Sequence, residues 1–136
     1  MMRGSMSGAR WISYSWAVLR VVPRVHLGSF VNVGVVVHAR TAGFLGTRLV
    51  DDPAEPARRV PDLDAELLAR YLRSWKGICE GEAASGRMAL SPASERFHWL
   101  TAPRSDVLQS SPVHDGVCED PARALDEMFA AYVGAR

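Results

Sequence analysis

The 136-residue sequence is poor in residues and motifs that support several common activities. Two cysteines, Cys79 and Cys118, without a CxxC pair, cannot form a four-thiolate zinc site. The four histidines show no HxxxH or HExxH spacing, and no glycine-rich nucleotide loop or GxSxG elbow occurs. The sequence therefore offers no motif for zinc, nucleotide phosphates or a serine hydrolase, and we expect no metal and no cofactor.

Long apolar stretches are also missing. No run approaches the roughly 20 residues that a membrane-spanning helix needs. Residues 1–10 lack the apolar core of a secretory signal. We therefore expect a cytoplasmic protein that does not engage a membrane. Residues 1–10 are interpreted as a flexible tail and residues 11–136 as one domain, which is long enough to bury a core without disulfides.

Acidic residues are absent from the first 50 positions, which hold six arginines. All fifteen acids follow, beginning with Asp51. The two halves either pack together and neutralise each other, or the N-terminal half presents a basic face to an anion or an acidic partner. The net charge is only +1, so bulk charge does not favour nucleic acid as a partner.

Three strands are predicted in the first half of the chain. Trp11–Val22, Ser29–Arg40 and Phe44–Val50 are rich in aromatic and β-branched residues and are separated by turn signals. Period-two alternation in the second strand places Val31, Val33, Val35, Val37 and Ala39 on one face, which we interpret as the core face. His38 and Arg40 fall on the other face, where we expect exposure.

The second half is predicted to be mostly helical. A helix follows a cap at Asp62 or Asp64 and ends near residue 80, with Cys79 on its apolar side. A short helix starts at Ser91-Pro92, with Ser91 as its cap, and a last helix opens at Asp120-Pro121. A further strand is placed at Ser105–Ser110, and loops at Asp51–Pro61, Glu82–Met88 and Pro112–Glu119.

This order of elements predicts an α+β fold. It consists of an antiparallel β-meander of three to four strands, with two main helices and one short helix packed on one face. No βαβ alternation is present, which argues against a parallel nucleotide-binding sheet.

Four blocks of the sequence, taken in order, resemble a known bacterial family. They are YSWAVLRVVP (14–23), GSFVNVGVV (28–36), ERFHWLTAPRS (95–105) and QSSPVHDG (109–116). The family is domain of unknown function 3037, and the resemblance runs from about residue 12 to about residue 133. It implies a small protein without an established activity. The resemblance also implies a HipA-like kinase as a partner, because genes of the family often sit beside genes for such kinases.

Two groups of polar residues are candidates for a binding site. Arg20 and Asn32 either line a polar pocket on the less apolar sheet face or are paired inside the fold. Arg96 and Arg104 flank an apolar run, and Ser111 and His114 follow in a proline-bearing segment. These four side chains suit a phosphate or a carboxylate, or else the arginines satisfy backbone carbonyls and nearby acids.

Aromatic residues accompany the arginines of the predicted sheet. Tyr14, Trp16 and Phe30 share the even positions with Arg20 and Asn32. Such a mixture is typical of a protein interface or a single-stranded nucleic-acid platform, or of a second core covered by the C-terminal half.

Our first functional interpretation is a non-enzymatic binding or accessory module. It would hold a protein partner, with a HipA-like kinase implied by the resemblance, through the aromatic and arginine-bearing face or the Arg96–His114 region. The alternative is a small enzyme or sensor of a phosphorylated or other anionic small molecule. In that case Arg96 and Arg104 would clamp the anion and His114 would act as acid or base.

Overall fold

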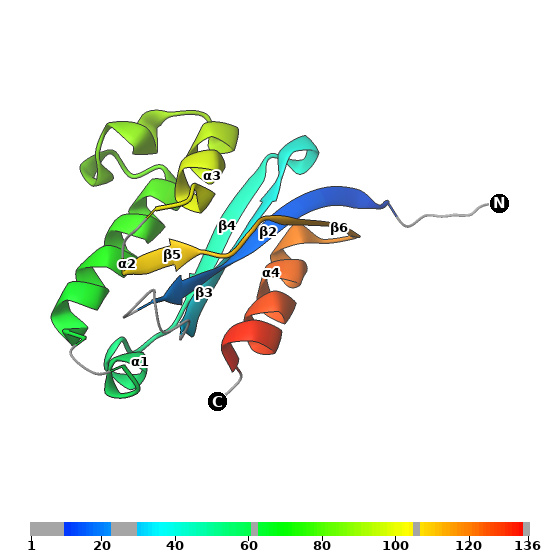
Figure 1. The fold of residues 1–136 in the computed structure, drawn as a ribbon. Coiled ribbons are helices and arrows are strands. Elements are labelled where there is room, and N and C mark those ends of the chain that lie inside the picture. The colour runs from blue at the N-terminus through cyan, green and yellow to red at the C-terminus, as the bar shows by residue number, and fades with distance from the viewer. Residues whose placement is uncertain (1–9, 23–29, 61–62, 105–106, 135–136) are drawn as a thin grey trace.

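The structure, a computed structural model, describes residues 10–22, 30–60, 63–104 and 107–134 (Figure 1). The predicted tail up to residue 9, the strand connection at 24–28 and the predicted cap Asp62 lie outside the described residues. The α+β class with an antiparallel meander is confirmed.

The first three described strands follow the sequence prediction closely. β2 (Ile12–Val21), β3 (Val31–Ala39) and β4 (Phe44–Leu49) pair in order as an antiparallel meander. β5 (Leu108–Ser110), also expected, pairs with the C-terminal half of β2. The predicted loop at Pro112–Glu119 is wrong, because β6 (His114–Cys118) pairs with the N-terminal half of β2. β6 is largely exposed and lacks an apolar alternation, so periodicity could not reveal it.

The long helix ends as its capping residues predict. α2 (Ala65–Glu80) begins after Asp64, whose side chain accepts a hydrogen bond from the Glu66 amide. It stops at Gly81, which adopts a left-handed φ of 75°. The loop expected at Asp51–Pro61 contains a short helix, α1 (Ala54–Arg58). The expected flexible loop after α2 instead forms two 3₁₀ turns, Ala83–Ser85 and Arg87–Leu90.

The two later helices were also predicted, with one correction. α3 (Ala93–Thr101) has Pro92 at its N-cap without a side-chain hydrogen bond, so Ser91 does not cap it. α4 (Pro121–Phe129) begins at Asp120, whose carboxylate accepts from the amides of Ala122 and Arg123. A π-helical turn, Ala130–Gly134, continues α4.

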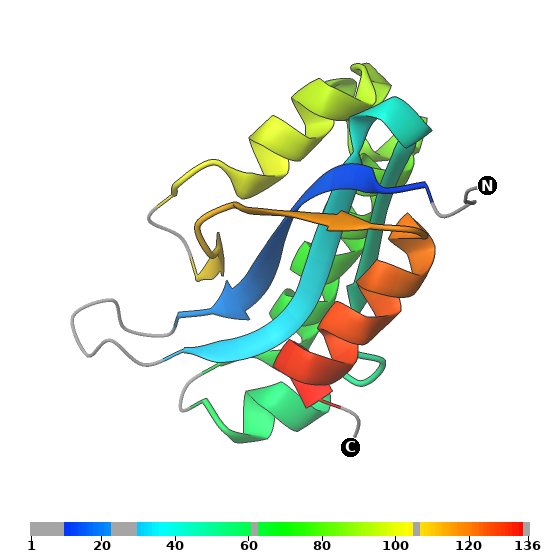
Figure 2. The same cartoon turned by 90° about the vertical axis from the view of Figure 1, so that its right-hand side faces the viewer.

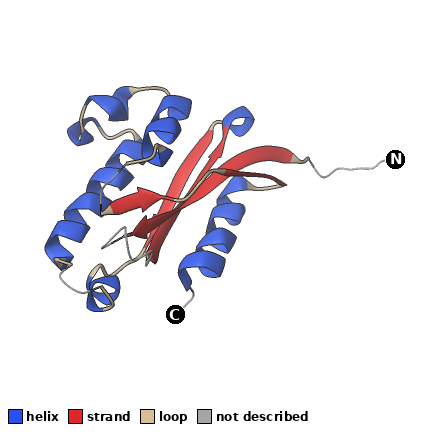
Figure 3. Cartoon of the chain, in the orientation of Figure 1, coloured by secondary structure: helices blue, strands red, loops and turns tan. Residues whose placement is uncertain are grey.

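The helices cover both faces of the sheet, which corrects the expected one-sided packing (Figures 1 and 3). α2 and α3 lie over one face, and α4 lies over the other. Each face has its own core. Leu68, Trp75, Phe97 and Leu100 belong to the α2/α3 core, and Leu125 and Val133 belong to the α4 core. The apolar stripes of α2 and α3 share one face of the sheet, and the stripe of α4 is buried against the other.

The strand β3 supplies valines to both cores. Val33 and Val36 belong to the α2/α3 core, whereas Val35 and Val37 belong to the α4 core. The predicted odd-numbered core face is therefore wrong. The pairing register between β2 and β3 shifts between Leu19 and Arg20, and an extra residue on β3 breaks the alternation there.

Candidate functional site

α4 covers only part of its side of the sheet. It packs mainly against β3 and β4, and from β2 it takes Tyr14, Trp16 and Val18 into its core (Figure 2). Six side chains from four segments of the chain meet beside this covered part. We call them the aromatic face: Trp16, Arg20, Phe30, Asn32, His114 and Tyr132.

The centre of the aromatic face is a group of three rings. Trp16 lies opposite His114 in the β2–β6 register, and their ring centroids are 4.8 Å apart. The ring of Tyr132 lies 5.1 Å from Trp16 on its other flank. Trp16 also packs against the α4 core, while Tyr132 remains 46% exposed. The core thus fixes the central ring and leaves the outer rings accessible.

Arg20 and Asn32 lie beside this group as cross-strand partners. The Arg20 guanidinium carbon is 4.3 Å from the centroid of the Phe30 ring, a cation–π contact, and Phe30 is 50% exposed. Asn32 Nδ2 donates to the Tyr132 carbonyl at 2.9 Å, which ties the turn after α4 to the sheet. Arg20 and Asn32 therefore share one face, as the sequence predicted.

Two buried polar atoms of this pair have no hydrogen-bond partner. They are Arg20 Nε, a donor, and Asn32 Oδ1, an acceptor. An unsatisfied buried polar group costs about 1–3 kcal/mol.

Ser111 has a structural role at the junction of β5 and β6. It is 5% exposed, and its Oγ accepts from the Val18 amide at 2.9 Å and donates to the Pro112 carbonyl at 3.0 Å. The Ser111 amide donates to the Val18 carbonyl at 2.8 Å. This side chain holds the strand junction against β2.

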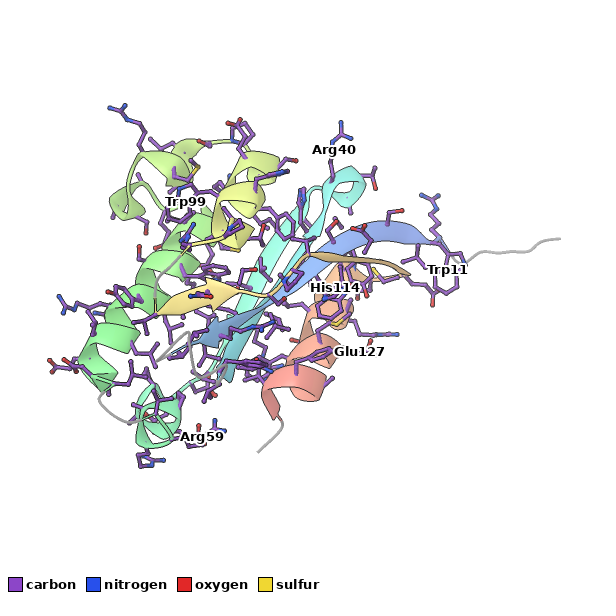
Figure 4. The ribbon with its side chains drawn as sticks, in the orientation of Figure 1. Trp11, Arg40, Arg59, Trp99, His114 and Glu127 are labelled. Atoms are coloured by element: carbon purple, nitrogen blue, oxygen red, sulfur yellow. The ribbon has the colours of Figure 1, made fainter. Side chains whose placement is uncertain are left out.

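The two arginines of the second predicted group are separate from each other and from His114. Arg96 donates to the carbonyls of Ser91 and Cys79, at 2.6 and 3.3 Å, and so joins the end of α2 to the start of α3. Arg104 stacks on Trp99 at 4.2 Å and donates to the Trp99 carbonyl. Figure 4 shows His114 well apart from Trp99. The structure therefore does not gather Arg96, Arg104, Ser111 and His114 into one cleft.

The environment of His38 also differs from the prediction. His38 is partly buried rather than exposed, with its ring 5.0 Å from that of Phe97 and its Nε2 3.4 Å from Ser94 Oγ. Burial, with smaller effects of Arg40 and His98, lowers the pKa of His38 below its ordinary value of 6.5. Arg40 is exposed, as expected.

Sequence reasoning missed Tyr132 as a member of the aromatic face. Its spacing from Leu125, Met128 and Phe129 continues the apolar stripe of the last helix, a pattern that favours a core-facing position. The π-helical turn places it instead against Trp16. No local signal in the sequence marks that turn.

Metal and membrane features are not found in the part of the chain that the structure describes. No group of three or more metal-ligating side chains occurs within residues 10–22, 30–60, 63–104 and 107–134. Within the same ranges, no helix has the length and apolar character needed to cross a membrane.

The fold and the site define an α+β protein with helices on both faces of an antiparallel sheet and a partly exposed, aromatic and arginine-bearing area on the α4 side. The family described as a protein of unknown function, DUF3037, matches residues 16–133. The chain belongs to this family. No curated protein and no solved structure matches it.

Proposed function

We propose that this protein is a non-enzymatic binding module that holds a protein partner on the aromatic face. The observation that carries the proposal is the combination of accessible aromatic rings with an arginine and an asparagine whose buried polar atoms lack partners. Interface hot spots are enriched in tryptophan, tyrosine and arginine, and they pair buried polar groups across the contact.

The choice of partner class follows from the shape and chemistry of the face. The rings of Trp16, His114 and Tyr132 form a continuous platform rather than an enclosed pocket, which suits a protein surface. The Arg20 Nε donor and the Asn32 Oδ1 acceptor, which lack partners, match the carbonyl and the N–H of a peptide bond. The family resemblance makes a HipA-like kinase the first partner to test.

A single substitution on the aromatic face should weaken the complex strongly. Phe30→Glu places a carboxylate on a half-exposed position beside Arg20 and removes the aromatic contact. We expect a loss of about 2 kcal/mol of binding free energy, or about 30-fold in Kd, as for an interface hot spot. The measurement is affinity purification of the tagged protein from its host, followed by titration with the partner that co-purifies.

Two control variants make this experiment decisive. Leu90→Glu introduces the same charge at a 69% exposed apolar position in a 3₁₀ turn beside α2, and it should leave the complex intact. His114→Ala should weaken binding less than Phe30→Glu does, because Trp16 and Tyr132 remain. An affinity that Phe30→Glu leaves unchanged, or that Leu90→Glu lowers equally, would place the partner elsewhere and overturn the proposal.

A further inference from the structure

A cavity of about 170 Å³ lies on the other side of the sheet from the aromatic face, between α2, α3 and β5. Ile78, Leu100 and Leu108 supply apolar surface to it. Tyr71, Trp75 and Trp99 supply aromatic surface. An engineered apolar cavity of about 150 Å³ accepts benzene, so the space here suits one six-membered ring.

The aromatic walls of this cavity are held in place by the fold. Trp75 is 5% exposed, and its indole Nε1 donates to Thr47 Oγ1 at 3.1 Å. Its polar atom is therefore satisfied, and the ring presents only apolar surface to the cavity. Trp99, also in the wall, is 38% exposed. Ser74 and Ser110 bring hydroxyl groups to the wall, and the Ser110 hydroxyl is already used in a hydrogen bond to a backbone carbonyl. A ring that enters therefore finds aromatic partners beside a small number of polar groups.

Arg104 is the one charged residue among the described lining residues. Its guanidinium stacks on Trp99 at 4.2 Å, and one of its five donors is used by the Trp99 carbonyl. No acidic side chain among the described residues forms an ion pair with it. The stacking and the carbonyl bond orient the guanidinium, and no carboxylate of the described residues takes its remaining donors.

We propose that this cavity binds a small aromatic carboxylate. The ring occupies the space between Trp75, Trp99 and Leu100, and the carboxylate accepts hydrogen bonds from Arg104. Six of the nine described lining residues are aromatic or aliphatic, which does not suit a hydrated phosphate, and a neutral aromatic offers Arg104 no carboxylate. This site is independent of the proposed protein partner, because it lies in the α2/α3 layer.

Benzoate is the probe that tests this proposal. Titration of the full chain, followed through its amide NMR signals, should give saturable shifts at Ser74, Leu100 and Ser110, around the cavity. Benzyl alcohol, which carries the same ring without the charge, should bind at least about tenfold more weakly, because a charge-assisted hydrogen bond contributes about 1.5–3 kcal/mol.

Substitutions separate the contribution of the Arg104 charge to binding from that of the cavity volume. Arg104→Gln should raise the Kd for benzoate by at least about tenfold and leave that for benzyl alcohol unchanged. The matched control is Arg73→Gln on the exposed side of α2, which should change neither. Ser74→Phe, at an exposed position of α2 on the cavity rim, should weaken both ligands by narrowing the cavity.

Three results would overturn the proposal. They are the absence of saturable shifts, shifts confined to other parts of the molecule, and benzoate binding that Arg104→Gln does not weaken. Circular dichroism and urea unfolding of each variant distinguish a lost site from a lost fold. Partner capture by the aromatic face is measured separately, so either proposal can fail alone.

Discussion

At the scale of single residues, the arginines divide by what their guanidinium groups contact. Arg96 is committed to two backbone carbonyls between helices. Arg48 pairs with Asp126 at 3.2 Å on the surface, an exposed ion pair that contributes little stability. Arg20 and Arg104 stack on aromatic rings without an acidic partner among the described residues. These last two are therefore the arginines on which the two binding proposals rest.

His38 predicts a pH dependence of stability. Its pKa is lowered in the folded protein, so the unfolded chain binds the proton more readily. The stabilising contribution of neutral His38 is complete above its ordinary pKa of 6.5 and declines as the pH falls through that value. Urea unfolding at a series of pH values should show this decline in the wild type and a smaller one in His38→Gln.

The control for this pH experiment is a variant that keeps His38. Ser13→Ala, on the exposed part of β2, removes no titratable group and should retain the pH profile of the wild type. Equal pH slopes for the wild type and His38→Gln would show that His38 is not the group responsible.

At the scale of elements, Ser111 joins β5 to β6. Leu19 of β2 pairs with Ser110 of β5, and Trp16 of β2 pairs with His114 of β6. Two residues of β2 thus lie opposite three residues of the junction, and the pairing register along β2 shifts by one residue. Pro112 has no N–H to donate inside this junction. The Ser111 hydroxyl accepts from the Val18 amide, a bond that strand pairing would otherwise supply.

Ser111→Ala should therefore destabilise the protein by about 1–3 kcal/mol, because the Val18 amide loses its buried acceptor. The measurement is the free energy of unfolding in urea, with amide hydrogen exchange at Val18 as a local readout. Ser13→Ala, on the exposed part of β2, is the matched control and should be nearly neutral. Unchanged exchange at Val18 in Ser111→Ala would refute the role of this hydroxyl.

At the scale of the whole molecule, the two free cysteines report on global opening. Cys79 is 1% exposed in the α2/α3 core, and burial raises its pKa to about 12. Cys118, at the end of β6, is only partly buried. A thiol reagent should label Cys118 in the native protein and should reach Cys79 only when the core unfolds.

The thiol experiment uses Cys118→Ser to isolate the buried group. Labelling of Cys79 in that variant should accelerate with urea in step with global unfolding. Labelling at a rate independent of urea would indicate that the α2/α3 layer opens locally, without unfolding of the sheet.

The sequence predicted those features whose signals are local. The meander follows from β-branched runs and turn residues, and the ends of α2 and α4 follow from Asp64, Gly81 and Asp120. The shared face of Arg20 and Asn32 also followed from alternation, although β3 contains an irregularity. β6 was missed because edge pairing is a backbone property that its exposed side chains do not encode.

By itself, therefore, the sequence determined the α+β class, most element boundaries and the presence of an aromatic, arginine-bearing sheet. Only the tertiary structure decided that helices cover both sheet faces, that Tyr132 joins Trp16, and that Arg104 and His114 lie apart. The physical reason is the distance along the chain over which each kind of signal acts. Capping and periodicity act within a few residues, whereas the covering of a face depends on contacts between segments that are distant in the chain.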